Sequence, residues 1–425
     1  MIKQVLKYTS LSVIGMLSIS VYILVDTLFV SNVIGPLGLA SLNLAIVVFS
    51  LITGIGLMIG VGGATLFIQK KDNKFFTLSL ILGILFGLVF LMIGVFFPDL
   101  VVRLLQADNE TYQFTYEYVR TIMIFTPVFM TNNVLISFVR HDKNPRLAMM
   151  AMVVSSAANI FLDYLFMVPL GMGMFGASFA TSLSSLFSIG LLLTHFYKNK
   201  TRTLSLVQVK IVVKDFLMIL KNGIASFVNE FSQSITLFLF NIVILSIHGN
   251  LGLSAYGIIA NISLIVFAVM TGIGQGLQPI IGRYYRKNDH VNLYKTIRAG
   301  LWMAFGFSLI MYLSLSLSSE SVIRLFVSDD VVIGLSKNAL RIYFIGFLFA
   351  SVNVIVGLSL NVLNDAKKAF SISILRGFLL SIPFLLIFSK FFGFEGVFLS
   401  FVITELVVSV ISLVAIKLKE RQITQ

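Results

Sequence analysis

The chain has 425 residues, of which 58% are hydrophobic and only 12% are charged, and its mean hydropathy is +0.99. Soluble globular domains are nearer half apolar and a quarter charged, so this composition excludes a soluble enzyme or binding module. The absence of Cys excludes a disulfide framework, a thiolate nucleophile and a cysteine metal site. The net charge of +13 does not gather on one face of a soluble segment, so we expect no nucleic-acid partner.

Apolar runs of about 20 residues, the length that a helix needs to cross the hydrocarbon core, recur along the chain. Several runs are longer than one span requires, which predicts tilt, bending or protrusion of those helices. The twelve runs cover approximately 8–33, 39–68, 77–98, 114–139, 146–168, 175–196, 218–247, 253–282, 294–317, 333–362, 368–389 and 395–416. We therefore expect an all-α integral membrane protein with twelve transmembrane helices.

The basic residues alternate from one loop to the next. Most of the 31 Lys and Arg residues lie in the two tails and in the loops that follow the even-numbered spans. The loops after the odd-numbered spans hold only Arg103, Arg324 and Lys390. Because cytoplasmic loops carry the excess of Lys and Arg, this pattern predicts a multi-pass protein of the cell membrane with both termini in the cytoplasm.

The two halves of the chain repeat each other. Residues 38–70 align without a gap to 252–284, and farther along Asn132 aligns to Asn353. Each half holds six spans, and an even number leaves both halves in the same orientation. We expect two pseudo-symmetric six-helix bundles around a central cleft, an arrangement that suits alternating access. The expected domains are an N-terminal lobe at 1–200, a cytoplasmic linker at 201–216 and a C-terminal lobe at 217–425.

Three local segments resemble the multidrug and toxic compound extrusion (MATE) family of cation-coupled exporters. They are "VDTLFV" at 25–30, "GVGGATLF" at 60–67 and "ANIFLDYLFMVPLGMGMFGASFAT" at 158–181. With the twelve spans and two lobes, the resemblance covers the whole chain and is nearest to the bacterial and archaeal branch with a cation site in the N-terminal lobe. It implies multidrug efflux by antiport of amphipathic organic cations against H⁺ or Na⁺. No other cofactor is implied, and we expect a monomer in the bilayer.

Ionisable residues inside a span are costly and mark function by default. Asp26 lies in the outer half of span one and Asp163 in the outer half of span five, with Asn159 one turn before it on the same helix face. Two carboxylates with amide and hydroxyl oxygens could hold a small cation, or they could share a proton. The alternative without a functional role is that both carboxylates lie near the outer membrane interface and are simply solvated by water. The resemblance assigns ion coupling to Asp26, Asn132 or Asn133, Asn159, Asp163 and Thr181, with sodium as one candidate ion at Asp26, Asn159 and Asp163.

A second polar patch lies in span seven, where Glu230 stands within "SFVNEFSQS" at 226–234. We expect Glu230 to serve as a substrate counter-charge or a second proton carrier, with helix packing as the alternative. The branches that use a glutamate here pair it with an aspartate of span ten, which this chain lacks. The expected patch comprises Asn229, Glu230, Gln233 and Asn353. Arg376 and Glu405 could pair within the same lobe.

Glycine and proline suggest local helix geometry. Related exporters are thought to bend span one at a proline, but span one here has only Gly15. Pro127 in span four and Pro279 in span eight are the interior prolines that could kink helices. The run "GIGLMIGVGG" at 54–63 resembles a phosphate loop, but it lies inside a span, so we expect close helix packing through small residues.

Other functions fit less well. The sequence has no G-x-S-x-G or H-E-x-x-H motif, so we expect no enzyme activity. The runner-up is a flippase for a lipid-linked oligosaccharide with the same superfold, whose anionic substrate should require several Arg or Lys in the cleft. A channel is disfavoured because no filter-like loop is visible. Forty Phe and 16 Met favour adaptable binding of organic cations.

Overall fold

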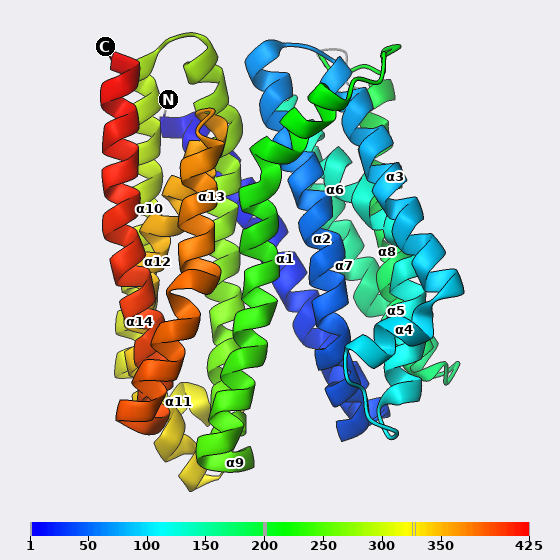
Figure 1. The fold of residues 1–425 in the computed structure, drawn as a ribbon, viewed down its shortest axis with the longest axis vertical. Helices are drawn as coiled ribbons and strands as arrows, with labels where there is room; N and C mark the ends of the chain where they lie inside the picture. Colours follow the sequence, from blue (N-terminus) through cyan, green and yellow to red (C-terminus); the bar gives the residue numbers. More distant parts are fainter. Residues whose placement is uncertain (1, 199–201, 325, 328, 425) are drawn as a thin grey trace. The chain divides into compact units, whose positions relative to one another are not determined.

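The computed structural model describes residues 2–198, 202–324, 326–327 and 329–424, and all regular secondary structure in these residues is helical (Figure 1). The helices are α1 (Ile2–Val33), α2 (Pro36–Lys70), α3 (Lys74–Phe96), α4 (Pro98–Leu104), α5 (Tyr112–Ile124), α6 (Thr126–His141), α7 (Pro145–Met167), α8 (Gly173–Lys198), α9 (Val213–Arg286), α10 (His290–Leu317), α11 (Ser319–Ile323), α12 (Asp330–Val362), α13 (Ala366–Ile374), the π-helical turn η1 (Leu375–Leu379) and α14 (Ser381–Thr424).

Within the described residues, ten helical stretches are long and apolar enough to cross a membrane, and the bent pair of α5 and α6 makes eleven. The last stretch, Ala366–Ile423, is broken by a non-helical residue at Gly393, so it can cross the membrane twice. This is consistent with the twelve predicted spans. The predicted all-α, multi-span membrane fold is confirmed.

The sequence repeat reappears in the backbone where spans join. Gly35, between α1 and α2, has a φ of 89°, and Gly249, which breaks α9, has a φ of 56°. The same offset that aligns 38–70 with 252–284 relates these two glycines. Gly173 at the start of α8 and Gly393 inside α14 form a second such pair, at 55° and 57°. Only glycine adopts this left-handed conformation without steric cost, so both halves turn at equivalent glycines.

Pro127 makes span four different from its counterpart in the second half. α5 and α6 meet at a bend of 54°, whereas α12 runs unbroken through the equivalent region. Proline lacks an N–H and clashes with the preceding turn, so the predicted kink at Pro127 is confirmed. α3 packs closely at this bend, because a Cβ at Gly87 would lie only 2.5 Å from the Cα of Pro127.

Contacts divide the chain into two compact units. The N unit is Ile14–Phe231, and the C unit comprises the start of the chain through Val13 together with everything from Ser232 onward. Within the N unit, α2 packs on α6 and α7 on α8; within the C unit, α12 packs on α10 and α14. In the C unit, the first turns of α1 and the last turns of α14 lie at the same end, with α11 at the other (Figure 1). The division of the chain into lobes at 1–200 and 217–425 remains a prediction.

The first span of each half begins in the unit of the other half, and glycines make this possible. In the C unit, a Cβ at Gly276 would lie 2.6 Å from the Cα of Thr9, so α1 starts against the backbone of α9. In the N unit, a Cβ at Gly223 would overlap the carbonyl oxygen of Met58, so α9 starts against α2. The repeat offset relates Thr9 to Gly223, which makes the two contacts equivalent. The glycine-rich run at 54–63 therefore serves close helix packing, as predicted.

The described part of the expected linker is held on the N unit. Asn73 binds it twice, donating to the carbonyl oxygen of Thr203 at 3.0 Å and accepting from the amide of Ser205 at 3.0 Å. The buried carboxylate of Asp142 accepts from the amides of Thr203 and Leu204 and from Nε2 of His195 at 2.8 Å. We call residues 203–207 the strap.

Candidate functional site

Three helices of the N unit bring four of the predicted coupling residues to buried positions. α1 carries Asp26, α7 carries Asn159 and Asp163 one turn apart, and α8 carries Thr181. Asn159 and Asp163 are 0% exposed, Thr181 is 5% exposed and Asp26 is 6% exposed. Residues spaced four apart on a helix project on one face, so Asn159 and Asp163 meet α8 together.

Asn159 joins Asp163 to Thr181. One amide atom of Asn159 lies 3.1 Å from Oδ2 of Asp163 and the other lies 3.2 Å from Oγ1 of Thr181. With its nitrogen toward Asp163, the amide donates to an ionised carboxylate and accepts from the Thr181 hydroxyl. With its oxygen toward Asp163, the same geometry is a hydrogen bond only if the carboxyl carries a proton. The backbone amide of Thr181 also faces this side chain at 3.3 Å and can only donate, so every contact is satisfied when the nitrogen points toward Asp163.

Each acid also has an oxygen without a partner. Oδ1 of Asp26 and Oδ1 of Asp163 are buried and accept no hydrogen bond within the described residues. Neither acid forms an ion pair within the described residues. The two carboxyl groups are close enough to interact electrostatically. A buried polar oxygen without a partner is costly, so these two atoms are the unsatisfied positions of the site.

Two tyrosines belong to this cluster and were missing from the sequence prediction. Tyr22 lies one turn before Asp26 on α1 and interacts electrostatically with Asp26 and Asp163. Tyr118 on α5 is 5% exposed and lies beside Thr181. The spacing of four between Tyr22 and Asp26 could have revealed the first. Nothing in the local sequence links Tyr118 to α1 or α7.

Asn132 and Asn133 of α6 have other neighbours. Oδ1 of Asn132 accepts from Oγ of Ser188 at 2.6 Å. Nδ2 of Asn133 donates to the carbonyl oxygen of Phe129 at 3.2 Å. Ser188 stands about two turns along α8 from Thr181, so Asn132 extends a polar track along α8 away from Asp163. No hydrogen bond found within the described residues connects Asn132 or Asn133 to the two acids, and their part in coupling remains a prediction.

The predicted polar patch of span seven is divided between the units. Glu230 and Asn229 belong to the N unit, where the Cβ of Glu230 would lie 3.6 Å from a Cβ built at Gly54. Gln233 belongs to the C unit and is exposed, and Asn353 is buried there. The contacts within each unit therefore do not join Glu230 with Asn353. The substrate role of these four residues remains a prediction.

A buried ion pair lies inside the C unit. Nε of Arg376 on η1 donates to Oε1 of Glu405 on α14, and Glu405 is 1% exposed. Nδ2 of Asn353 donates to Oε2 of Glu405 at 2.7 Å, and Oδ1 of Asn353 accepts from Ser412 at 2.8 Å. The sequence-based suggestion that Arg376 and Glu405 pair is confirmed.

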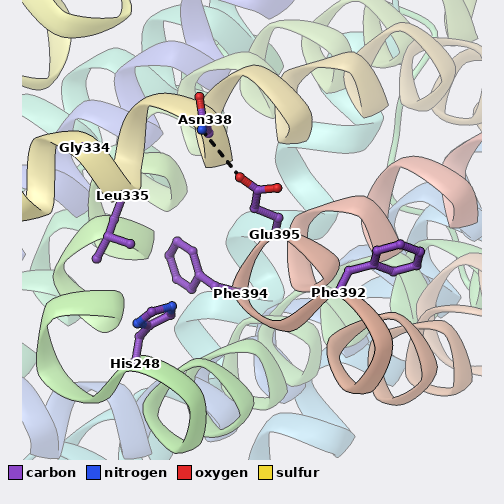
Figure 2. Close-up of a pocket in the computed structure, with 7 residues that line it drawn as sticks. All are labelled: His248, Gly334, Leu335, Asn338, Phe392, Phe394 and Glu395. Atoms are coloured by element: carbon purple, nitrogen blue, oxygen red, sulfur yellow. Dashed lines mark hydrogen bonds between the residues drawn. The ribbon is translucent and has the colours of Figure 1, made fainter.

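The C unit also has an open cavity of ≈ 290 Å³ (Figure 2). In it, Asn338 donates to Glu395 at 3.5 Å, and the ring of Phe394 stands edge-on to His248 with centroids 4.9 Å apart. It lies beside the two helix breaks at Gly249 and Gly393. Its lining residues are His248, Gly334, Leu335, Asn338, Phe392, Phe394 and Glu395, none of which the sequence analysis selected.

Comparison with known proteins places this geometry in a family. The MatE family model matches residues 12–165 and 225–387, which is more than half of the chain. The chain belongs to the MatE family. The resemblance found in the sequence is thus confirmed at the level of family, and the chain is a transporter-family protein and not an enzyme.

Curated relatives match over nearly the whole length. "Multidrug export protein MepA" of Staphylococcus saprophyticus is 22% identical over 432 residues, covering 99% of this chain and 95% of that protein. The protein of the same name from Staphylococcus aureus strain NCTC 8325 is 23% identical over 431 residues, covering 99% and 95%. These names describe the relatives.

Solved structures share the fold. One described as an outward-facing multidrug resistance MATE transporter of the MOP superfamily aligns with a TM-score of 0.91 at 23% identity, covering 99% of this chain and 96% of that chain. A MOP superfamily transporter from Pyrococcus furiosus, described as having a binding pocket of reversed polarity, aligns with a TM-score of 0.91 at 22% identity, covering 100% and 96%. At these identities the comparison establishes the fold alone.

Proposed function

We propose that this chain exports amphipathic organic cations from the cell and takes up protons in exchange, with Asp163 and Asp26 as the coupling residues. The observation that carries the proposal is the pair of buried carboxyl groups in one unit, each with an oxygen that has no protein partner. Membership of the MatE family and the export function named for the MepA relatives support the transport part.

A proton fits this pair for two physical reasons. Two ionised carboxylates in a low-dielectric interior repel each other, and desolvation penalises each charge, so binding one proton relieves both costs. One charge that crosses about 100 mV is worth about 2.3 kcal/mol, enough to drive modest accumulation of a substrate.

Sodium is the second candidate ion. Oδ1 of Asp26, Oδ1 of Asp163, and the oxygens of Asn159 and Thr181 are the hard oxygen donors that such a cation prefers. The described residues contain no group of three or more His, Cys, Asp or Glu that could hold a metal ion. A sodium site here would therefore depend on the amide and hydroxyl oxygens as well as the two acids. Protons need no such ligand set, so we place them first.

The remaining features of the proposal follow from sequence pattern. We place both termini in the cytoplasm of a cell-membrane protein, and we infer alternating access of the two lobes in a monomer. Glu230 is proposed as a counter-charge for the substrate, since its side chain lies in the N unit with the coupling acids. Asn132 is proposed to support coupling through the polar track on α8, and Asn133 from the adjacent position on α6.

An efflux assay tests the proposal. Ethidium export is measured from drug-sensitive bacteria that express the wild type or Asp163→Asn at matched levels, with and without a collapsed proton gradient. The control is Asp330→Asn, because the side chain of Asp330 is 85% exposed. We expect export by the wild type and the control to require the gradient and export by Asp163→Asn to be lost.

Two outcomes would contradict the proposal. Export that survives collapse of the proton gradient but requires sodium would show that sodium, and not the proton, is the coupling ion. A well-inserted wild type that exports no cation would favour a flippase for a lipid-linked oligosaccharide, the alternative with the same superfold.

A further inference from the structure

We propose that Arg376 binds the carboxylate group of a substrate in the C unit. The inference rests on the proposed export function and narrows its substrate class to amphipathic cations that also carry a carboxylate. It follows from which donors and acceptors of the Arg376–Glu405 pair are already engaged in hydrogen bonds.

The local fold directs Arg376 into the bundle. Arg376 lies on η1, a single π-helical turn between α13 and α14. Such turns insert an extra residue into a helix and occur frequently at functional sites. η1 closely approaches α9, because a Cβ at Gly377 would overlap the side chain of Ser232. The guanidinium then lies over the ring of Phe267, with its central carbon 5.3 Å from the ring centroid.

Both carboxylate oxygens of Glu405 already accept from protein donors. Its Oε1 accepts from Arg376, and its Oε2 accepts from Asn353 at 2.7 Å. Asn353 is itself held by Ser412 at 2.8 Å. Because Glu405 is 1% exposed and both of its oxygens are engaged, the pair presents no acceptor to an incoming substrate. The pair can therefore offer a substrate only hydrogen-bond donors.

Arg376 has the donors. A guanidinium carries five N–H groups in a rigid fork, and only the Nε–H is engaged with Glu405. Within the described residues, the four N–H groups on the two Nη atoms have no protein partner, and the side chain is 13% exposed. Parallel donation from the two Nη atoms matches a carboxylate. Phe267 beneath the guanidinium adds an apolar wall for an aromatic substrate.

The internal repeat argues against a purely structural role for the pair. The positions in the first half that correspond to Arg376 and Glu405 are Ser155, by the offset that relates Asn132 to Asn353, and Ser185, by the offset that relates Gly173 to Gly393. Both are neutral, and Oγ of Ser155 donates to the carbonyl oxygen of Ser184 at 3.0 Å, so a small polar side chain suffices to join these helices. Replacing a buried ion pair by neutral residues often costs nothing in stability. The charges in the second half therefore call for a function other than packing.

The test compares two dyes that differ only in their oxygen group. Rhodamine B carries a free carboxylate, and its ethyl ester is a simple cation. Purified protein is measured for binding of each dye in detergent and for transport in proteoliposomes. The test variant is the neutral double substitution Arg376→Gln with Glu405→Gln, which leaves no unpaired buried charge. The control is Ser155→Ala at the equivalent position of the first half.

We expect the wild type and Ser155→Ala to prefer rhodamine B over the ester, and the double variant to lose this preference by about tenfold, the size of one good charge-assisted interaction. Arg376→Lys should lose most of the preference too, because lysine keeps the charge but lacks the fork. An unchanged preference in a folded double variant, or equal loss of both dyes, would overturn the inference. The binding measurement decides it even if the wild type transports neither dye, an outcome that counts against the proposed export function alone.

Discussion

At the scale of single residues, Asn159 determines how Asp163 is satisfied. Its side-chain amide contacts both the acid and Thr181, and it is fully buried. Hydrogen bonds to a charged group are worth about 1.5–3 kcal/mol, more than bonds between neutral groups. We therefore expect Asn159→Ala to lower ethidium efflux by roughly tenfold or more at unchanged expression.

The matched control is Asn338→Ala, since within the described residues that amide makes a single long hydrogen bond, to Glu395 at 3.5 Å. Equal efflux by Asn159→Ala and the wild type would show that the amide plays no part in coupling. Comparable losses in the two variants would indicate a general sensitivity to lost amides.

Sequence alone located the acids but not their full surroundings. Asp26, Asn159, Asp163 and Thr181 could be selected because ionisable residues are rare in spans and because the family pattern supplies their partners. Tyr118 could not be selected, since its place beside Thr181 depends on how α5 packs against α8. Asn132 was grouped with the acids although its bond to Ser188 lies about two turns away along α8.

At the scale of helices, the contact between the start of α9 and α2 depends on Gly223. We expect Gly223→Ala to prevent stable folding, because its methyl group would overlap the backbone of Met58 and neither helix can yield. Gly257→Ala on the same helix is the control, since no atom lies within 4 Å of its added Cβ. Monodisperse protein recovered in detergent is the measure, and equal recovery of both variants would contradict the packing account.

The strap supplies a pH-dependent prediction outside the membrane. Burial alone would raise the pKa of Asp142, but hydrogen bonds from His195, Thr203 and Leu204 outweigh it and hold the pKa below its usual range. A carboxyl with a lowered pKa stabilises the fold above its unfolded pKa of about 3.9, and this contribution is lost as pH falls through the folded pKa. We expect Asp142→Asn to cost about 1–3 kcal/mol at pH 7 and progressively less below about pH 4.

Thermal unfolding of the purified protein across this pH range measures that effect. Asp330→Asn again serves as the exposed control. A penalty for Asp142→Asn that stays constant down to pH 3 would mean that the charge of Asp142 does not hold the strap.

Long helices could be predicted from sequence and short ones could not. Hydropathy over about 20 residues found every long span, and Pro127 gave a physical reason for the bend between α5 and α6. The short helices α4 and α11 and the turn η1 contain 7, 5 and 5 residues, too few for any window average to detect. The position of Arg376 inside the bundle depends on η1, so sequence could only suggest its pairing with Glu405.

At the scale of the whole molecule, the orientation in the membrane can be tested because the chain has no Cys. Single cysteines report the side of each loop without background labelling. We expect Glu110→Cys, after span three, to react with a membrane-impermeant maleimide in intact cells. We expect Lys287→Cys, after span eight, to react only once cells are permeabilised. The opposite pattern would reverse the predicted topology.

The central claim is that substrate and proton compete through Asp163 and Asp26. The most direct measurement is proton release when purified protein in weakly buffered detergent solution binds ethidium. The account predicts that binding to the wild type releases protons and that binding to the Asp26→Asn, Asp163→Asn double variant releases none. Ethidium binding to the wild type without proton release would contradict the account.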